Sequence, residues 1–134
     1  MISKSIKNAV IFGCEGPRLT EVEFNFFKES LPFGFILFSR NIFNAKQVNE
    51  LCQSLRDAVG WYAPILIDQE GGRVQRINPP LALYRLPPLD EAQKAGQNAK
   101  SIFKLRFSEI ANELLSLGID FNCAPVLDLS LIHI

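Results

Sequence analysis

The residues best suited to chemistry in this sequence lie between positions 68 and 76, directly after the apolar run Ile65–Ile67. Two carboxylates, Asp68 and Glu70, are followed by a pair of glycines and by the arginines Arg73 and Arg76. Carboxylates accept hydrogen bonds from hydroxyl groups, and guanidinium groups donate forked pairs of hydrogen bonds to oxygen-rich groups. The glycines allow the backbone to turn sharply or to approach a ligand closely. This composition indicates a polar binding or acid–base site.

Four apolar runs are expected to position these residues as strands: 8–14, 34–38, Ile65–Ile67 and 119–124. Runs that are apolar on both faces are typical of strands buried within a parallel sheet. Asp68 would then lie at the carboxyl end of the third strand, where α/β sheets and barrels place their ligand sites. Composition alone leaves ligand binding and simple capping of a loop N–H equally open for Asp68.

Helices are predicted between the strands. Thr20 and Glu23 have the spacing of a capping box and predict the start of the first helix. Asn44 is a suitable N-cap for the second helix, and Gly60 stands where that helix should end. Phenylalanines at helical spacing on the first helix, such as Phe27, are expected to be core residues that face the sheet.

The third helical region follows an irregular loop, 78–88, which contains four prolines. Asp90 is a candidate cap, Gly96 is expected to break or bend the helix, and Gly118 should end it. One apolar stripe falls at helical spacing on this segment: Phe103, Phe107, Ile110 and Leu114. Long loops in compact domains are often functional, so the loop itself is of interest.

The order of these elements predicts an α/β fold, with about four β-α units that lack only the last helix. A whole (β/α)8 TIM barrel needs about 250 residues, so this 134-residue chain corresponds to the first half of one. Neither the G-x-G-x-x-G fingerprint of dinucleotide binding nor a P-loop follows the first strand. A Rossmann fold is therefore disfavoured.

The charge balance and the cysteine and histidine content argue against nucleic acid, a membrane surface or zinc as a partner. Fourteen basic side chains balance fourteen acidic ones, which gives no general attraction for nucleic acid or for a membrane surface. Three widely spaced cysteines, Cys14, Cys52 and Cys123, and the single histidine His133 do not make a zinc site. Free, buried thiols and the lack of a signal-peptide pattern favour the cytoplasm.

The stretch 68–76 (DQEGGRVQR) resembles the signature of glycoside hydrolase family 3, in particular its bacterial β-N-acetylhexosaminidases. Two further blocks, 34–41 (GFILFSRN) and 118–128 (GIDFNCAPVLD), resemble the second-strand and fourth-strand motifs of that family. The order and spacing of the blocks also match. The resemblance extends from about Asn8 to Asp128 and identifies residues 1–134 as a partial N-terminal TIM-barrel domain of this family.

The resemblance implies hydrolysis of terminal N-acetylglucosamine from peptidoglycan fragments in cell-wall recycling. It implies a retaining mechanism with a covalent intermediate on an aspartate, a histidine as the general acid/base, and no metal or organic cofactor. Transferred residue by residue, Asp68 matches an aspartate that binds sugar hydroxyls, and Arg76 matches an arginine of the substrate pocket. No catalytic residue and no metal ligand is assigned in this chain.

The remaining polar residues receive structural or secondary roles. Glu70 could form a retaining carboxylate pair with Asp68 only if the two groups lay about 5 Å apart across a sugar. Neighbours in a turn rarely face each other in this way, so Glu70 is expected to hold Arg73 or loop amides, and Arg73 to be structural. Arg40 and Asn41 are assigned mainly to loop structure. Asp128 could line the pocket or order Arg76, with a structural role slightly favoured.

The chain lacks the two family segments that carry the catalytic residues. The family's histidine segment (KHFPGHG) lies beyond the fourth strand, the nucleophilic aspartate comes later still, and neither is found here. His133 lacks that context and is not assigned the role. We therefore expect a barrel cut at its midpoint, inactive in isolation. The alternatives are a half-barrel remnant that binds sugar and self-associates through its open edges and, less favoured, a β-glucosidase, because 69–72 (QEGG) resembles the hexosaminidase branch.

Overall fold

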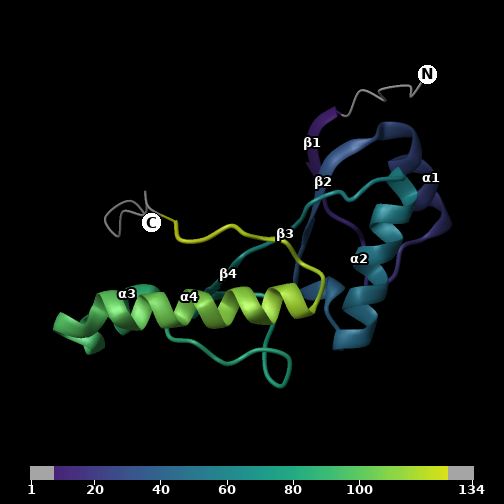
Figure 1. The fold of residues 1–134 in the computed structure, drawn as a ribbon. Coiled ribbons are helices and arrows are strands. Elements are labelled where there is room, and N and C mark those ends of the chain that lie inside the picture. The colour runs from purple at the N-terminus through teal and green to yellow at the C-terminus, as the bar shows by residue number, and fades with distance from the viewer. Residues whose placement is uncertain (1–7, 127–134) are drawn as a thin grey trace.

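The computed structural model describes residues 8–126. Its main sheet has the order β1-β2-β3-β6, and every pairing is parallel. The strands are β1 (Asn8–Phe12), β2 (Pro32–Leu37), β3 (Ile65–Ile67) and β6 (Phe121–Asn122). Figure 1 shows helices α1 (Glu21–Ser30) and α2 (Ala45–Val59) together on one side of β1 and β2. The predicted α/β class and the four parallel strands are confirmed.

The first two helices begin and end at the predicted residues. The Thr20 side chain accepts from the Glu23 backbone N–H at 3.2 Å, and the Glu23 carboxylate accepts from the Thr20 backbone N–H at 3.0 Å, which confirms the capping box. Asn44 caps α2 through a 2.9 Å bond from the Gln47 backbone N–H. Gly60 ends α2 with φ of 73°, in the left-handed region that favours glycine.

The third helical region consists of α3 (Pro88–Ala95), a 3₁₀ turn over Gly96–Asn98, and α4 (Ala99–Ser116). The predicted break at Gly96 is confirmed. The predicted cap at Asp90 is wrong, because α3 already begins at Pro88. Proline suits a first helical position, where its missing N–H costs nothing, and Asp90 lies instead in the first turn, near the positive end of the helix dipole.

A hairpin that the sequence did not predict follows β3. Strands β4 (Gln69–Gly71) and β5 (Val74–Gln75) pair antiparallel. The predicted sharp turn lies at Gly71 and Gly72, whose φ angles are 112° and 60°. A Cβ atom on Gly71 would lie 2.7 Å from the Leu86 carbonyl oxygen, so the position requires glycine both for its angle and for its space. The predicted loop 78–88 is irregular up to the start of α3.

The core lies between the sheet and helices α1, α2 and α4, and its fully buried strand residues are Phe35, Leu37, Ile65 and Ile67. Phe27 of α1 is buried against Phe35, with ring centroids 5.0 Å apart, as expected for a core phenylalanine. On α4 the stripe is less uniform, since Ile110 and Leu114 are buried but Phe103 is only half-buried. No helix within residues 8–126 is long and apolar enough to cross a bilayer.

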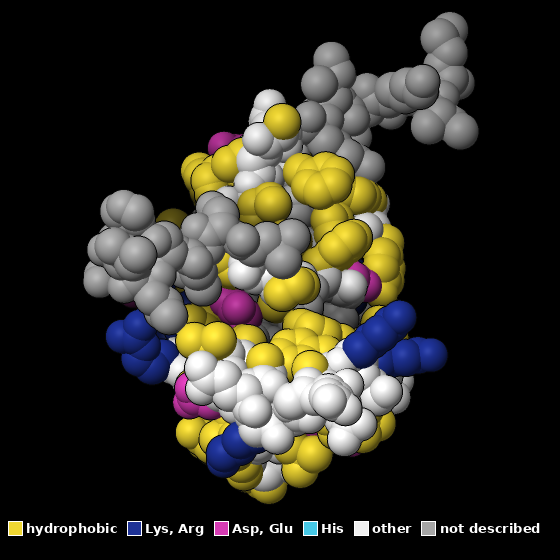
Figure 2. Space-filling view, turned by 90° about the vertical axis from the view of Figure 1, so that its left-hand side faces the viewer, with side chains coloured by type: hydrophobic (Ala, Val, Ile, Leu, Met, Phe, Trp, Pro, Cys, Tyr) yellow, Lys and Arg dark blue, Asp and Glu magenta, His cyan; other side chains and the backbone are white. Residues whose placement is uncertain are grey.

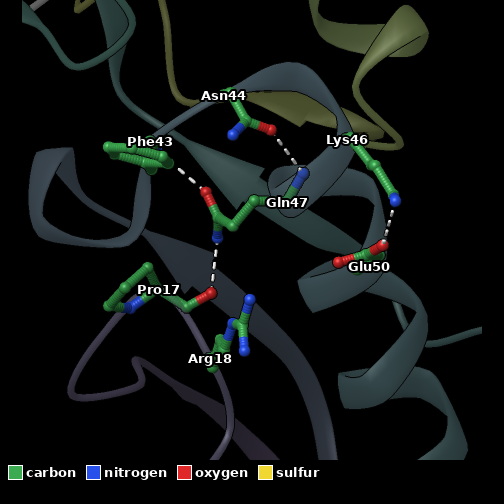
Figure 3. A pocket seen from close by; sticks show the side chains of 7 residues that line it. All are labelled: Pro17, Arg18, Phe43, Asn44, Lys46, Gln47 and Glu50. Atoms are coloured by element: carbon green, nitrogen blue, oxygen red, sulfur yellow. Dashed lines mark hydrogen bonds and ion pairs between the residues drawn. The ribbon is translucent and has the colours of Figure 1, made fainter.

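The loops that follow β1 and β2 are tied together by a buried glutamine at the start of α2. Gln47 Oε1 accepts from the Phe43 backbone N–H at 2.8 Å, while its Nε2 donates to the Pro17 carbonyl (Figure 3). The same Nε2 also donates to the Asn41 carbonyl at 3.0 Å. One neutral amide therefore fixes the carboxyl-end loops of two neighbouring strands relative to each other.

Candidate functional site

Asp68 and Arg76 lie opposite each other at the carboxyl end of β3. Asp68 is the first residue after the strand, and its Oδ2 accepts from Arg76 Nη2 at 3.2 Å. Their side chains are 27% and 28% exposed, so the ion pair is shielded on one side and open to solvent on the other. A carboxylate and a guanidinium in this arrangement present acceptors and donors together, which suits a ligand rich in hydroxyl groups.

A buried glutamine between them sets this geometry. Gln69 Oε1 accepts from the backbone N–H groups of Arg76 and Ile77 at 2.9 and 3.0 Å, and its Nε2 donates to the Ile77 carbonyl at 2.9 Å. The Asn122 side chain of β6 binds the Gln69 backbone on both its N–H and its carbonyl, at 2.9 and 3.0 Å. Gln69 directly follows Asp68 and binds the backbone of Arg76, so both site residues are held by the same hydrogen-bonded unit.

Phe38 connects this pair to the neighbouring strand end. The guanidinium carbons of Arg40 and Arg76 lie 4.7 and 5.8 Å from the centre of its ring, within reach of a cation–π interaction. Arg40 Nε donates to the Cys14 carbonyl at 3.1 Å. Asn41 is fully buried and accepts from the Phe38 backbone N–H at 2.8 Å. The assignment of Arg40 and Asn41 to loop structure agrees with these contacts.

A cleft of about 210 Å³ opens beside Arg76. Its polar groups are Ser39, Arg76 and Asn78, and no carboxylate lines it. The rest of its wall is apolar: Ile42, Phe43, Pro79, Pro80 and Leu81. The mixture of apolar surface with a few polar groups is typical of small-molecule sites, and the predicted functional interest of the proline-rich loop stays a prediction.

Glu70 and Arg73 do not join the site. Glu70 is buried, and its backbone carbonyl accepts from Arg106 Nη2. Burial lowers the pKa of the Arg106 guanidinium, the nearby charge of Arg85 lowers it further, and the Glu70 charge raises it. Glu70 therefore acts on Arg106 and not, as expected, on Arg73, which is exposed and has no ion pair among residues 8–126.

Two buried arginines, Arg85 and Arg106, connect the loop beside the site to helices α3 and α4. The sequence analysis did not predict them. Arg85 forms a two-pronged ion pair with Glu113 of α4, at 2.8 and 3.1 Å. Arg106 of α4 donates to the Leu86 carbonyl at 2.9 Å and pairs with Glu91 of α3. A signal was available for Arg106, because it lies three residues after Phe103 and four before Ile110, on the buried face of the helix.

The cysteines divide into two kinds. Cys14 and Cys52 are buried as expected, and burial raises the pKa of their thiols to about 11 and about 12. Cys123, predicted to be buried, is exposed because β6 ends at Asn122 and no further strand among the described residues covers it. Burial of its sulfur, together with the charge and a hydrogen bond of Asp68, raises the Cys123 pKa.

In the described part of the chain no three potential ligand side chains gather as a metal site. Asp128 and His133 lie outside the described residues.

No protein-family model matches the chain. A β-hexosaminidase of Haemophilus influenzae is 35% identical over 124 residues, which cover 91% of this chain and 35% of that protein. A crystal structure of NagZ from Neisseria gonorrhoeae in complex with N-trifluoroacetyl-D-glucosamine superposes with a TM-score of 0.79 and 30% identity, covering 93% of this chain and 38% of that one. For a glycoside hydrolase family 3 β-N-acetylglucosaminidase from Paenibacillus, the TM-score is 0.66 at 27% identity, covering 86% and 22%.

The alternating β-α units with their parallel sheet match the N-terminal part of the NagZ barrel. More particularly, the chain is homologous to the N-terminal part of bacterial β-hexosaminidases of glycoside hydrolase family 3. The resemblance drawn from the three sequence blocks is confirmed. The chain spans about a third of the length of the curated relatives that it matches, 35% in the Haemophilus protein.

Proposed function

We propose that this chain supplies part of the sugar-binding surface of a β-N-acetylhexosaminidase that removes terminal N-acetylglucosamine from peptidoglycan fragments during cell-wall recycling. The observation that carries the proposal is the Asp68–Arg76 pair at the carboxyl end of β3, within a fold that matches the N-terminal part of NagZ. The NagZ complex with N-trifluoroacetyl-D-glucosamine supports a ligand of the N-acylglucosamine class.

In this proposal Asp68 accepts hydrogen bonds from two sugar hydroxyls, and Arg76 donates to a neighbouring oxygen. Bonds to charged groups are worth roughly 1.5–3 kcal/mol each, and the pair is already oriented by Gln69 before a sugar arrives. The Asp68 carboxylate has spare lone pairs, because Arg76 engages only one of its oxygens.

The chemical step needs a proton donor and a nucleophile, and none of the residues of this chain is assigned to either role. Glu70 does not supply one, because it is buried beside Arg106 and away from the exposed pair. The whole enzyme's retaining reaction is therefore proposed for the longer protein, and binding without hydrolysis is proposed for these 134 residues. The cytoplasm is the proposed location, with the free thiols of Cys14 and Cys52 as its support.

The test is a titration of the ¹⁵N-labelled chain with N-acetylglucosamine, followed by amide chemical shifts. We expect shifts centred on residues 68–78 and a loss of affinity of about tenfold in Asp68→Asn, since one charged acceptor is removed. Asp57→Asn on the exposed side of α2 is the matched control and should bind as the parent does. Shifts confined to another surface would contradict the assignment.

A second measurement separates binding from catalysis. Release of 4-nitrophenol from 4-nitrophenyl N-acetyl-β-D-glucosaminide should stay at the buffer rate with the isolated chain. Hydrolysis by the isolated chain clearly above the buffer rate would show that its own residues carry the reaction, and the site assignment would then be wrong.

A further inference from the structure

Hydrophobic and charged side chains lie next to one another on the side of the molecule that Figure 2 shows, around a hollow in the surface. At the candidate site a contact of this kind is made by Phe38, which directly follows β2. The guanidinium carbons of Arg40 and Arg76 lie 4.7 and 5.8 Å from its ring centre. The ring is half-buried and lies outside the buried core of the described residues. Its contacts at the site are therefore with cations, which an aromatic face attracts.

The Arg76 side chain needs a support beyond its backbone. Gln69 fixes the Arg76 backbone N–H, but the side chain that follows has several rotatable bonds. Within residues 8–126 the guanidinium meets the Asp68 carboxylate at 3.2 Å and the Phe38 ring. A sugar that bonds to Asp68 shares the acceptor of the first contact and leaves the second unchanged. The ring is thus the contact that can hold Arg76 once a sugar is bound.

An aromatic ring suits this role because it attracts a guanidinium without taking up its N–H groups. A carboxylate or a carbonyl in the same place would accept hydrogen bonds that a sugar oxygen needs. The Arg76 Nε is buried and has no hydrogen-bond partner in the described part of the chain. The guanidinium beside Phe38 therefore keeps donors that a ligand can use.

Phe38 is itself held in place before a ligand arrives. The parallel register pairs Leu37 with Ile67, so the residues that follow them, Phe38 and Asp68, lie on neighbouring strand ends. Arg40, which lies over the same ring, donates from Nε to the Cys14 carbonyl at 3.1 Å. A ring anchored in this way loses little freedom when it supports Arg76, so the orientation of the site is set in advance.

We propose that Phe38 is a positioning residue for sugar binding, whose ring holds the Arg76 guanidinium in the direction in which it donates to the sugar while Asp68 accepts. This inference rests on the function proposed for the Asp68–Arg76 pair and adds to it the residue that directs the arginine. Because Phe38 acts through Arg76, removal of the ring should weaken binding only while the arginine is present.

The contact is first tested without sugar, on the unsubstituted ¹⁵N-labelled chain. The Nε–H signal of Arg76, assigned by its loss in Arg76→Met, should be displaced by the ring current of Phe38. In Phe38→Leu it should return toward the position of a solvated arginine. A parent signal already at that position would overturn the proposal, and this measurement depends neither on sugar binding nor on the folding of a Phe38 variant.

Binding is then measured by chemical-shift titration with N-acetylglucosamine. Phe38→Leu should weaken the affinity about two- to fivefold, the range of a cation–π contact at a partly exposed site, and Phe38→Tyr, which keeps the ring, should restore it. Phe33→Leu is the matched control. Phe33 lies near the opposite end of β2 and is 51% exposed, so this variant should bind as the parent does.

A double-mutant cycle separates positioning from a general structural role. In the Arg76→Met background, Phe38→Leu should cost no further affinity, because the ring has lost the group on which it acts. A loss that persists in that background, or a Phe38→Leu variant that binds as tightly as the parent, would overturn the positioning role and leave the proposed function intact. A parent chain that does not bind N-acetylglucosamine at residues 68–78 would overturn both.

Discussion

Two loop segments at the carboxyl ends of the strands are held in place by different kinds of buried side chain. The segment 38–47, after β2, is held by the buried neutral amides Asn41 and Gln47, which bond to the neighbouring loop at Cys14, Gly16 and Pro17. The segment 68–87, after β3, also contains a buried amide, Gln69, but it is fastened to α3 and α4 through the buried arginines Arg85 and Arg106.

The two segments differ in whether their buried polar groups are neutral or charged. In the segment 38–47, neutral amides satisfy backbone carbonyls of the neighbouring loop without introducing a buried charge. The buried arginines pair with carboxylates and fasten the long loop to α3 and α4. That loop leaves Asp68 and Arg76 open to solvent on a fixed support, which is the arrangement a binding site needs.

The largest expected effect comes from Arg106→Met. It removes the cation that pairs with Glu91 and lies beside Glu70, so buried carboxylate charge is left uncompensated. Breaking a buried pair in this way costs about 3–5 kcal/mol, and urea unfolding followed by circular dichroism should show this loss. Lys104→Met, on the exposed side of the same helix, should change the free energy of unfolding very little. Equal stability of the two variants would remove the distinction drawn between the regions.

The next effect is expected at Gly71→Ala. A φ of 112° is unfavourable for alanine, and the added Cβ would lie 2.7 Å from the Leu86 carbonyl oxygen. We expect a loss of about 2–3 kcal/mol in the free energy of unfolding. Gly16→Ala in the amide-held region is the control, because nothing lies within 4 Å of a Cβ there and its φ is not positive. A neutral Gly71→Ala would mean that the hairpin relaxes and does not fix the site.

The amides themselves can be compared directly by Gln69→Leu and Asn41→Leu. Each change leaves buried backbone groups without partners, which costs about 2 kcal/mol by urea unfolding. Only Gln69→Leu should also weaken binding of N-acetylglucosamine, because only that amide fixes the backbone of Arg76. Chemical-shift titration of both variants gives the answer, and equal loss of affinity would show that binding follows global stability and not local geometry.

Whether the sequence predicts a contact depends on how far apart along the chain its two partners lie. Thr20 with Glu23, Asn44 and Gly60 act on backbone within a turn of helix, so residue type and spacing were sufficient. The family motif predicts Asp68 and Arg76 as sugar-binding residues, and that role stays a prediction. The contacts of Gln69 with Asn122 and of Arg106 with Leu86 join residues 53 and 20 positions apart. Such partners depend on how the elements pack, and no local pattern specifies them.

The carboxylate of Glu23 on α1 accepts from backbone N–H groups of the loop that the segment 38–47 holds, and this gives the smallest predicted effect. Burial raises the pKa of Glu23, but hydrogen bonds from the backbone N–H groups of Thr20 and Glu15 and from the Thr20 hydroxyl outweigh it, so the pKa lies below its ordinary value of 4.5. A lowered pKa in the folded state means that the contribution is complete at neutral pH. It is lost as the pH falls from the unfolded value through the folded one.

Glu23→Gln should therefore cost about 1 kcal/mol at pH 7 by urea unfolding, and the difference from the parent should shrink toward pH 3. Glu29→Gln, an exposed change on the same helix, should show neither the loss nor its pH dependence. Apart from the bond of Arg40 Nε to the Cys14 carbonyl, the segment 38–47 is held to that loop by neutral amides, so Glu23 should account for most of the acid sensitivity of this region. A Glu23→Gln variant that remained equally acid-sensitive there would show that charge, and not only neutral amides, holds both regions.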